Sequence, residues 1–278
     1  MKIIESIAEM QAQSRAWRKE GFSVGVVPTM GALHDGHLSL VELANARSDK
    51  TVVTIFVNPT QFAPGEDLDK YPRTFEQDKS LCEEHGADAI FFPSVNEMYI
   101  PDASTWVGEE VLSQGYCGAS RPSHFRGVTT IVTKLYNAVL PDIAVFGEKD
   151  YQQLQVLKKM TADLNFPIEV VPGKIWREES GLAMSSRNMY LSDTEKEAAL
   201  SIYNSLTAAA EKTSKNSNLV GVREVISDKI SSTGGKVDYV ETVHAETLEK
   251  VDVVEGPVRC LVAAHFGPAR LLDNIQLY

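Results

Sequence analysis

Short apolar runs that alternate with helical patterns as far as Pro172 constrain the fold of this chain more than any other feature. The runs are rich in Val, Ile and Phe and are bounded by Gly, Pro, Asn or Asp, which is typical of buried β-strands. They predict strands at 23–27, 52–57, 89–92, 143–146 and 168–171. Apolar residues at helical spacing predict helices at 4–19, 37–47, 75–85, 125–139 and 152–164. This alternation favours an α/β fold with a Rossmann-like, doubly wound parallel sheet.

The pattern changes beyond Pro172. A mixed, loop-like stretch at 173–188 precedes two polar helical segments, which we predict at 194–212 and 219–231, joined by an exposed connection at 213–218. Strand-like runs then return at 237–243 and 258–264, followed by a short terminal segment. We therefore expect two domains: a Rossmann-like domain at 1–173 that binds the ligands, and a smaller α+β domain at 174–278 that closes over the site.

Charge and cysteine usage narrow the class of partner. The formal net charge is −11 and the pI is near 5.1, so the chain as a whole should repel nucleic acid and anionic membranes. No apolar run approaches the ~18 residues of a membrane-spanning helix. The first residues lack a signal-peptide pattern, and Cys82, Cys117 and Cys260 form neither a disulfide framework nor a metal-binding spacing. We predict a cytoplasmic protein that acts on small molecules.

The segment His34-Asp35-Gly36-His37 carries the strongest chemical signal. It lies where a predicted strand passes into a predicted helix, and histidines three residues apart share one face of a helix. Such a junction offers free backbone N–H groups and the positive end of a helix dipole, which suits phosphate. Gly31 and Gly36 remove side chains near the backbone. Two imidazoles there can donate hydrogen bonds to charge that develops on a phosphoryl group.

Three other interpretations of this segment remain open. A zinc site would need a third protein ligand, and no Cys, His or Glu cluster is near in sequence. The histidines could also be ordinary surface or capping residues. The spacing from Gly31 to Gly36 matches a P-loop, but His37 and Leu38 stand in place of its lysine and hydroxyl residue. Phosphate chemistry without a P-loop is the interpretation that we favour.

Polar residues also follow two other predicted strands. Amides at Asn58 and Gln61 follow the strand at 52–57, where they could bind the hydroxyls of a small substrate or simply form a turn. Lys149 and Asp150 follow the strand at 143–146. Lysine suits phosphate, and aspartate suits a hydroxyl or a helix N-terminus, although a charged loop is the alternative.

A basic hydroxyl-bearing loop, Met184-Ser185-Ser186-Arg187, lies between the two expected domains. It could wrap the outer phosphates of a nucleotide and close over the substrate, or it could be a linker. No Ser, Thr or Cys shows an adjacent base that would mark a covalent nucleophile. We therefore predict nucleotide chemistry by positioning and charge stabilisation, with one triphosphate surrounded by His34, His37, Lys149 and Arg187.

Two of these segments resemble known signatures. His34–His37 resembles the H-x-G-H motif of the nucleotidyltransferase and class I synthetase superfamily, and Met184–Arg187 resembles its second signature loop. The wider ordered set resembles the pantothenate synthetase (pantoate–β-alanine ligase) family. That set comprises Pro28–Gly31, Phe56–Phe62, Tyr71–Arg73, Phe146–Asp150 and Gly181–Asn188. The likeness runs to about Leu191 and resumes at 261–274.

The resemblance implies a two-step ligation. The carboxylate of pantoate attacks the α-phosphate of ATP to give pantoyl adenylate and pyrophosphate, and the amine of β-alanine then displaces AMP. His34 and His37 would stabilise the transition state with Lys149, and His37 would be the proton donor. The resemblance also implies a Mg²⁺ ion that bridges the phosphates, no metal ligands of the protein itself, and a homodimer formed through the first domain.

The resemblance further assigns ligand contacts residue by residue. The ATP site would comprise Met30, Gly31, Ala32, Leu33, His34, Asp35, Gly36, His37, Gly147, Glu148, Lys149, Asp150, Trp176, Met184, Ser185, Ser186 and Arg187. The pantoate and β-alanine site would comprise Gln61, Gln153, Asn58, Tyr71, Arg121 and His124. The chain departs from the family pattern at Trp176, where the family usually has a smaller side chain and the backbone faces adenine. It also departs at Ser123, where glycine is common before the histidine.

Two other functions would use the same phosphate site. A nucleotidyltransferase would stop at an adenylylated product, and the amides at Asn58, Gln61 and Gln153 favour the ligase because they suit a small hydroxy acid. A non-catalytic nucleotide-binding module would not need both histidines. An RNA-charging synthetase is disfavoured by the acidic chain, which shows no separate basic domain.

Overall fold

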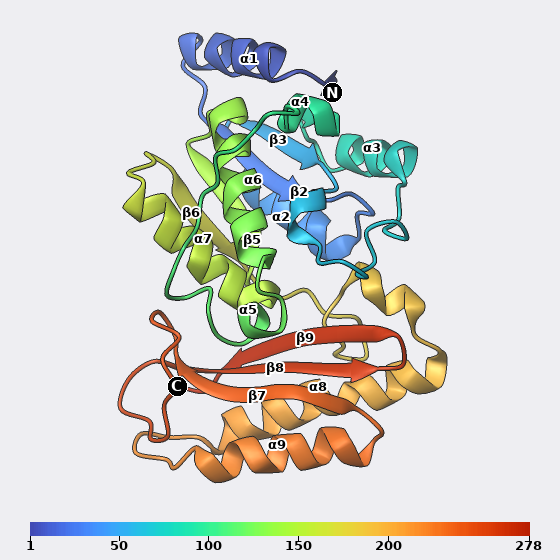
Figure 1. Cartoon of the computed structure of the whole chain (residues 1–278), viewed down its shortest axis with the longest axis vertical. Helices are drawn as coiled ribbons and strands as arrows, with labels where there is room; N and C mark the ends of the chain where they lie inside the picture. Colours follow the sequence, from blue (N-terminus) through green and yellow to red (C-terminus); the bar gives the residue numbers. More distant parts are fainter. The chain divides into compact units, whose positions relative to one another are not determined.

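The computed structural model describes residues 1–278, which form two compact units. The first unit comprises 1–148 and 152–174, and the second comprises 149–151 and 175–278. Figure 1 shows the elements of each unit. The short piece 149–151 belongs to the second unit although the chain on both sides of it belongs to the first.

A six-stranded parallel sheet forms the centre of the first unit, with the strand order β1-β4-β3-β2-β5-β6. The strands are β1 (Lys2–Ile4), β2 (Val24–Thr29), β3 (Lys50–Ile55), β4 (Ala89–Phe91), β5 (Ile143–Gly147) and β6 (Glu169–Gly173). The helices are α1 (Ile7–Lys19), α2 (Asp35–Asn45), α3 (Phe75–Glu84), α4 (Val95–Met98), α5 (Cys117–Ser120), α6 (His124–Val139) and α7 (Tyr151–Asp163). The predicted α/β class with a doubly wound parallel sheet is confirmed.

Burial on both faces explains why the strands read as continuous apolar runs. Val27 and Val53 join one core cluster with Leu40 of α2, while their strand neighbours Val26 and Val52 are also fully buried. Parallel sheets need such double cover because their crossover helices lie on both faces. Because β2 and β5 run parallel, their ends at Thr29 and Gly147, which precede α2 and α7, lie at the same edge of the sheet.

The prediction of a helix from Ile4 was wrong at its start. Residues Lys2–Ile4 pair with β4, so that Ile4 lies opposite Phe91, and the helix begins at Ile7 after the Ser6 cap. The hydroxyl of Ser6 accepts a hydrogen bond from the amide of Glu9, which is a standard N-cap. A strand of three residues is too short to show an alternation in the sequence. The strand predicted at 52–57 likewise lies two residues earlier, at Lys50–Ile55.

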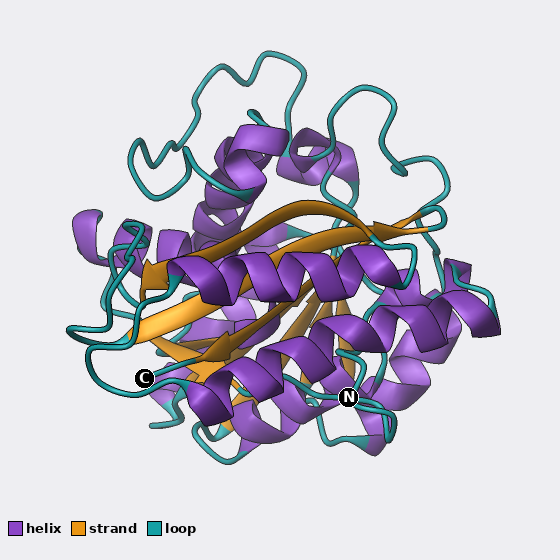
Figure 2. Ribbon diagram, turned by 90° about the horizontal axis from the view of Figure 1, so that it is seen from below, coloured by secondary structure: helices purple, strands orange, loops and turns teal.

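The second unit is an antiparallel sheet covered by helices. Its strands run in the order β7 (Lys236–His244), β8 (Val258–Phe266) and β9 (Ala269–Gln276). The long helices α8 (Asp193–Lys212) and α9 (Val220–Ser232) lie side by side and pack on this sheet, as Figure 2 shows. Leu206, Ile226 and Val262 belong to the core between them. The α+β character predicted for this part of the chain is confirmed.

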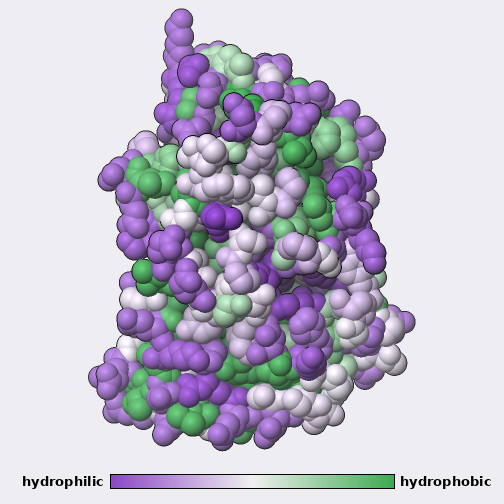
Figure 3. Space-filling view, in the orientation of Figure 1, coloured by the Kyte–Doolittle hydropathy of each residue, from purple (hydrophilic) through white to green (hydrophobic).

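The surface agrees with the acidic, polar composition. On the face drawn in Figure 3, hydrophilic residues predominate and hydrophobic ones form separate small groups. None of the helices is both long and apolar enough to cross a membrane.

Candidate active site

The two histidines of the H-x-G-H segment lie at the start of α2. His34 is the N-cap residue and His37 belongs to the first turn, where its amide donates to the carbonyl of His34 at 2.7 Å. The ring centroids are 4.0 Å apart with an interplanar angle of 34°. Both imidazoles therefore occupy the positive end of a helix at the carboxyl edge of the parallel sheet, a position that favours an anionic ligand.

A buried carboxylate holds the loop that leads to these histidines. The side chain of Asp78, on α3, is 1% exposed and accepts hydrogen bonds from the amides of Ala32 and Leu33 at 2.9 and 2.8 Å. The hydroxyl of Thr74 donates to both oxygens of the same carboxylate, at 3.2 Å each. The sequence does not reveal this contact, because Asp78 lies more than forty residues away in the chain and resembles any acidic residue in a first helical turn.

Gly31 adopts a backbone conformation that favours glycine, and its predicted contact with phosphate stays a prediction. Its φ of +82° lies in the left-handed region, and a Cβ there would lie 3.0 Å from the Asp78 carboxylate and 3.1 Å from Ile55. Ala32 follows with a φ of +52°, a conformation that is uncommon for a residue with a side chain. The space freed at Gly31 is therefore filled by the protein, and the Asp78 bonds stabilise the turn.

The amides after β3 divide into a buried one and a half-buried one. Asn58 is 1% exposed: its Nδ2 donates to Gln61 Oε1 at 3.0 Å and to the Gly127 carbonyl at 3.1 Å. Its Oδ1 accepts from the hydroxyl of Tyr99 at 2.8 Å. Gln61 is only half-buried, and its Nε2 donates to the sulfur of Met30 at 3.2 Å. Asn58 thus orients Gln61 and presents almost no surface of its own to a ligand.

Arg121 and His124 meet the backbone of Gln61. Arg121 Nη2 donates to the Gln61 carbonyl at 3.3 Å, and His124 Nδ1 lies 3.0 Å from the same oxygen. The guanidinium also forms a bidentate pair with Glu66, with both distances 2.6 Å. Burial opposes ionisation of Glu66, but the hydrogen bonds and charge of Arg121 outweigh it and hold the pKa of Glu66 below its usual value. Glu66 was missed because nothing in its sequence context marks it.

Two adjacent glutamines at the start of α7 differ in environment. Gln152 is 4% exposed and ties down the segment before α5: its Nε2 donates to the carbonyls of Leu112 and Gly115, both at 2.8 Å. Gln153, the predicted substrate residue, is half-buried. Tyr71, also predicted, is buried with its ring edge-on to Phe62 at 6.1 Å. Tyr71 therefore packs on Phe62, and its contact with substrate stays a prediction.

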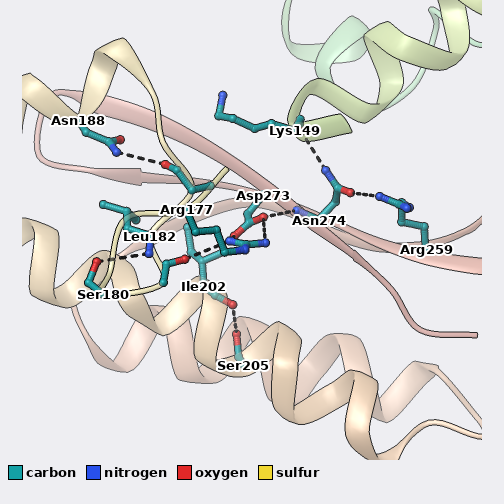
Figure 4. Close-up of polar contacts among 12 residues, drawn as sticks. Lys149, Arg177, Ser180, Leu182, Asn188, Ile202, Ser205, Arg259, Asp273 and Asn274 are labelled. Atoms are coloured by element: carbon teal, nitrogen blue, oxygen red, sulfur yellow. Dashed lines mark hydrogen bonds and ion pairs between the residues drawn. The ribbon is translucent and has the colours of Figure 1, made fainter. Parts of the chain in front are cut away.

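Two further ATP-site candidates, Gly147 at the end of β5 and Glu148 after it, belong to the first unit. The candidates from Lys149 onward belong to the second unit. Lys149 Nζ lies 3.6 Å from Asp150 Oδ1, and the Lys149 carbonyl accepts a hydrogen bond from Asn274 Nδ2 at 3.0 Å (Figure 4). Ser185 caps the short 3₁₀ turn Ser186–Tyr190, and its hydroxyl accepts from the amide of Arg187 at 3.3 Å.

Trp176 stands where the family pattern has a smaller residue. It is 46% exposed. Its carbonyl accepts from the amide of Met184 at 3.0 Å, so its backbone is part of the segment that presents the Met184–Arg187 loop.

Two buried thiols are protonated near neutral pH. Burial raises the pKa of Cys82 and of Cys260 to about 12, so neither is a thiolate nucleophile near neutral pH. No group of three or more His, Cys, Asp or Glu side chains is arranged to hold a metal ion.

Comparisons with known proteins assign the family. The sequence model described as pantoate–β-alanine ligase matches residues 2–276. A pantothenate synthetase of Thermotoga petrophila is 52% identical over 284 residues and covers all of both chains. The chain belongs to the pantoate–β-alanine ligase family. It is accordingly an enzyme of the ligase class.

Solved structures of the family share the fold. Pantothenate synthetase from Thermus thermophilus superposes with a TM-score of 0.94 at 41% identity, with all of both chains covered. Pantoate–β-alanine ligase from Francisella tularensis, in complex with β,γ-ATP and β-alanine, gives a TM-score of 0.84 at 32% identity and covers all of this chain and 98% of that one. The resemblance inferred from the motifs is confirmed by these matches.

Proposed function

We propose that this enzyme condenses pantoate with β-alanine to form pantothenate. The reaction cleaves ATP to AMP and pyrophosphate. The observation that carries the proposal is the imidazole pair at the N-terminus of α2, in a chain that belongs to the ligase family along nearly its whole length. The relative from Francisella tularensis was solved in complex with β,γ-ATP and β-alanine, which correspond to two of the three proposed substrates.

In the first step a carboxylate oxygen of pantoate attacks the α-phosphorus of ATP, and the bond to pyrophosphate breaks. His34 and His37 donate hydrogen bonds to the phosphoryl oxygens as charge develops, and His37 supplies the proton. Lys149 and Arg187 neutralise the charge of the phosphates, and the hydroxyls of Ser185 and Ser186 donate hydrogen bonds to them. The geometry of the imidazole pair supports this role because preorganised donors stabilise a transition state without further rearrangement.

Mg²⁺ fits this site as part of the nucleotide complex. Its preferred ligands are oxygens, it keeps several waters, and it is commonly bound through substrate phosphates. The chain has no ready-made cluster of ligands, so the ion would enter on the triphosphate and neutralise its charge.

In the second step the amine of β-alanine attacks the carbonyl of pantoyl adenylate and AMP leaves. Gln61 and Gln153 bind the hydroxyls of pantoate, and Gln61 also lies near β-alanine. Asn58 keeps the Gln61 amide in place, and Arg121 and His124 keep its backbone in place. Alignment of the two reactants is the main contribution of these residues.

The ATP groups are divided between the two units. His34 and His37 belong to the first unit, and Lys149 and Arg187 belong to the second. We propose that residues 174–278 act as a domain that closes over the ligands bound by residues 1–173. Small-angle scattering with and without ATP and pantoate tests this closure: an unchanged radius of gyration would count against it.

The assembly and location are also proposals. We infer a homodimer formed through the first unit, which static light scattering tests directly, and a cytoplasmic location, which cell fractionation tests. The acidic surface and the buried free cysteines support an enzyme of a reducing compartment.

The deciding experiment supplies ATP, Mg²⁺, pantoate and β-alanine and follows the products by mass spectrometry. We expect pantothenate and AMP in equal amounts, and transfer of one ¹⁸O from labelled pantoate carboxylate to AMP. Release of ADP would contradict the adenylate. Formation of AMP without a new amide would replace the ligase by an adenylyltransferase that stops at the first step.

A further inference from the structure

Two adjacent buried residues on β9 connect to the expected phosphate-binding parts of the second unit: Asn274 contacts Lys149, and Asp273 contacts Arg177, which precedes the Met184–Arg187 loop. Asp273 is 5% exposed and Asn274 is 2% exposed, although both are polar. Figure 4 shows that their contacts lead in different directions, one to Arg177 and the other to Lys149 and Arg259. Buried polar groups of this kind are costly unless all their hydrogen bonds are made, so this pair is a fixed feature of the unit.

The Asn274 side chain joins the Lys149 turn to the sheet. Its Nδ2 donates to the carbonyl of Lys149 at 3.0 Å, and its Oδ1 accepts from Arg259 Nη1 at 2.5 Å. The guanidinium of Arg259 in turn lies over the ring of Tyr151, 4.0 Å from its centroid. Asn274 thus fixes the backbone before Asp150, and Arg259 packs on the side chain that follows it. Figure 4 shows the Lys149 side chain extending away from this contact.

Asp273 holds the segment that presents the Met184–Arg187 loop. Arg177 donates to both of its carboxylate oxygens, at 2.7 and 2.9 Å, and to the Gly181 carbonyl at 3.1 Å. Arg177 and Ala183 form an antiparallel bridge directly before the loop. The amide of Asn274 donates to Asp273 Oδ1 at 2.7 Å, so the two sets of contacts share one strand and one hydrogen bond.

We propose that Asn274 is a positioning residue for Lys149. It fixes the Lys149 backbone relative to the Asp273–Arg177 pair, and so sets where the ammonium meets the triphosphate relative to Arg187. This inference rests on the phosphate role proposed for Lys149. A lysine side chain has four rotatable bonds, so an anchored backbone is what limits the space that its ammonium samples.

Asn274→Asp isolates the contact with Lys149. The carboxylate is nearly isosteric and can still accept from Arg259, but it places an oxygen against the Lys149 carbonyl in place of a donor. ATP–pyrophosphate exchange with pantoate measures adenylation alone. We expect its kcat to fall by about 30-fold, because a displacement of about 1 Å in a positioned group can cost 10²-fold. The KM for β-alanine in the complete reaction should stay within about twofold of wild type.

Gln276→Glu is the matched control. It makes the same change from amide to acid on the same strand, at an exposed side chain that donates to the Tyr278 carbonyl. Its exchange rate should equal that of wild type. An equal loss in both variants would mean that added negative charge, and not the contact with Lys149, causes the effect.

A double-mutant cycle with Lys149→Ala separates positioning from general damage. If Asn274 acts through Lys149, N274D should lower the kcat of exchange by less than about twofold in the Lys149→Ala background. The same 30-fold loss in both backgrounds, or no loss in wild type, would overturn the inference. If N274D melts below the assay temperature, Asn274→Ala goes through the same cycle. A wild-type enzyme without exchange activity would refute the proposed function instead, and an unaffected K149A would refute the role of Lys149.

Discussion

The two units hold their expected ATP-binding groups in different ways. In the first unit, His34 and His37 lie together at the start of one helix, and a carboxylate fixes the backbone just before them. In the second unit, Lys149 is fixed by Asn274, 125 residues further along the chain. A short motif places the two imidazoles together, although the carboxylate that fixes their loop comes from Asp78 on α3. Lys149 has no such local motif, and its backbone contact depends on a strand of the antiparallel sheet.

The largest expected effect lies in the first unit, at His37. His37→Ala removes a donor from the proposed transition state, and loss of one such donor costs about 10²–10³-fold in kcat. Because His37 is in the first turn of α2 and is not fully buried, the melting temperature should change little. ATP–pyrophosphate exchange and circular dichroism measure the two quantities. His265→Ala, at an exposed position of β8, is the control and should keep full activity.

Asp78→Ala tests whether a fixed backbone is what distinguishes the first half of the site. The change leaves the amides of Ala32 and Leu33 buried without their acceptor, and each such donor costs about 1–3 kcal/mol. We expect the free energy of unfolding in urea to fall by about 3 kcal/mol, and kcat to fall with it. If the protein loses stability but keeps its kcat, the loop does not depend on Asp78 for its active conformation.

Arg177→Lys tests the second half in a comparable way. A lysine lacks the planar fork by which two nitrogens of Arg177 reach both oxygens of Asp273 and the Gly181 carbonyl, and its single nitrogen makes these contacts less well. We expect the KM for ATP to rise by about tenfold, which corresponds to about 1.4 kcal/mol. Arg47→Lys, in an exposed pair with Glu169, should leave the KM unchanged. A kcat loss without a KM change would place Arg177 in a different role.

The same contrast explains what the sequence could predict. The sheet class, the H-x-G-H segment and the order of the strands and helices from β2 to β8, apart from the short helices α4 and α5, depend on local spacing and apolar runs, and these were predicted. The three-residue strand β1 was not predicted. Asp78, Glu66 and Asn274 were not predicted, because their partners are distant in sequence and each resembles an ordinary polar residue. Asn58 and Tyr71 were predicted as substrate contacts from their motifs. The sequence could not show that both are buried, and their contacts with substrate stay predictions.

The smallest expected effect concerns Glu66 and pH. Its pKa is lowered in the folded state, so the stability gained from its pair with Arg121 is present above the ordinary pKa near 4.5 and is lost as the pH falls through the lowered value. Glu66→Gln should therefore reduce the free energy of unfolding at pH 7 by about 1 kcal/mol or less, since the pair is partly exposed. The difference from wild type should shrink in urea titrations as the pH falls below 4.5, whereas Glu169→Gln, at an exposed pair, should show no measurable difference over the same range. A difference that persists at acid pH would mean that packing of the Glu66 side chain, and not its charge, stabilises the first unit here.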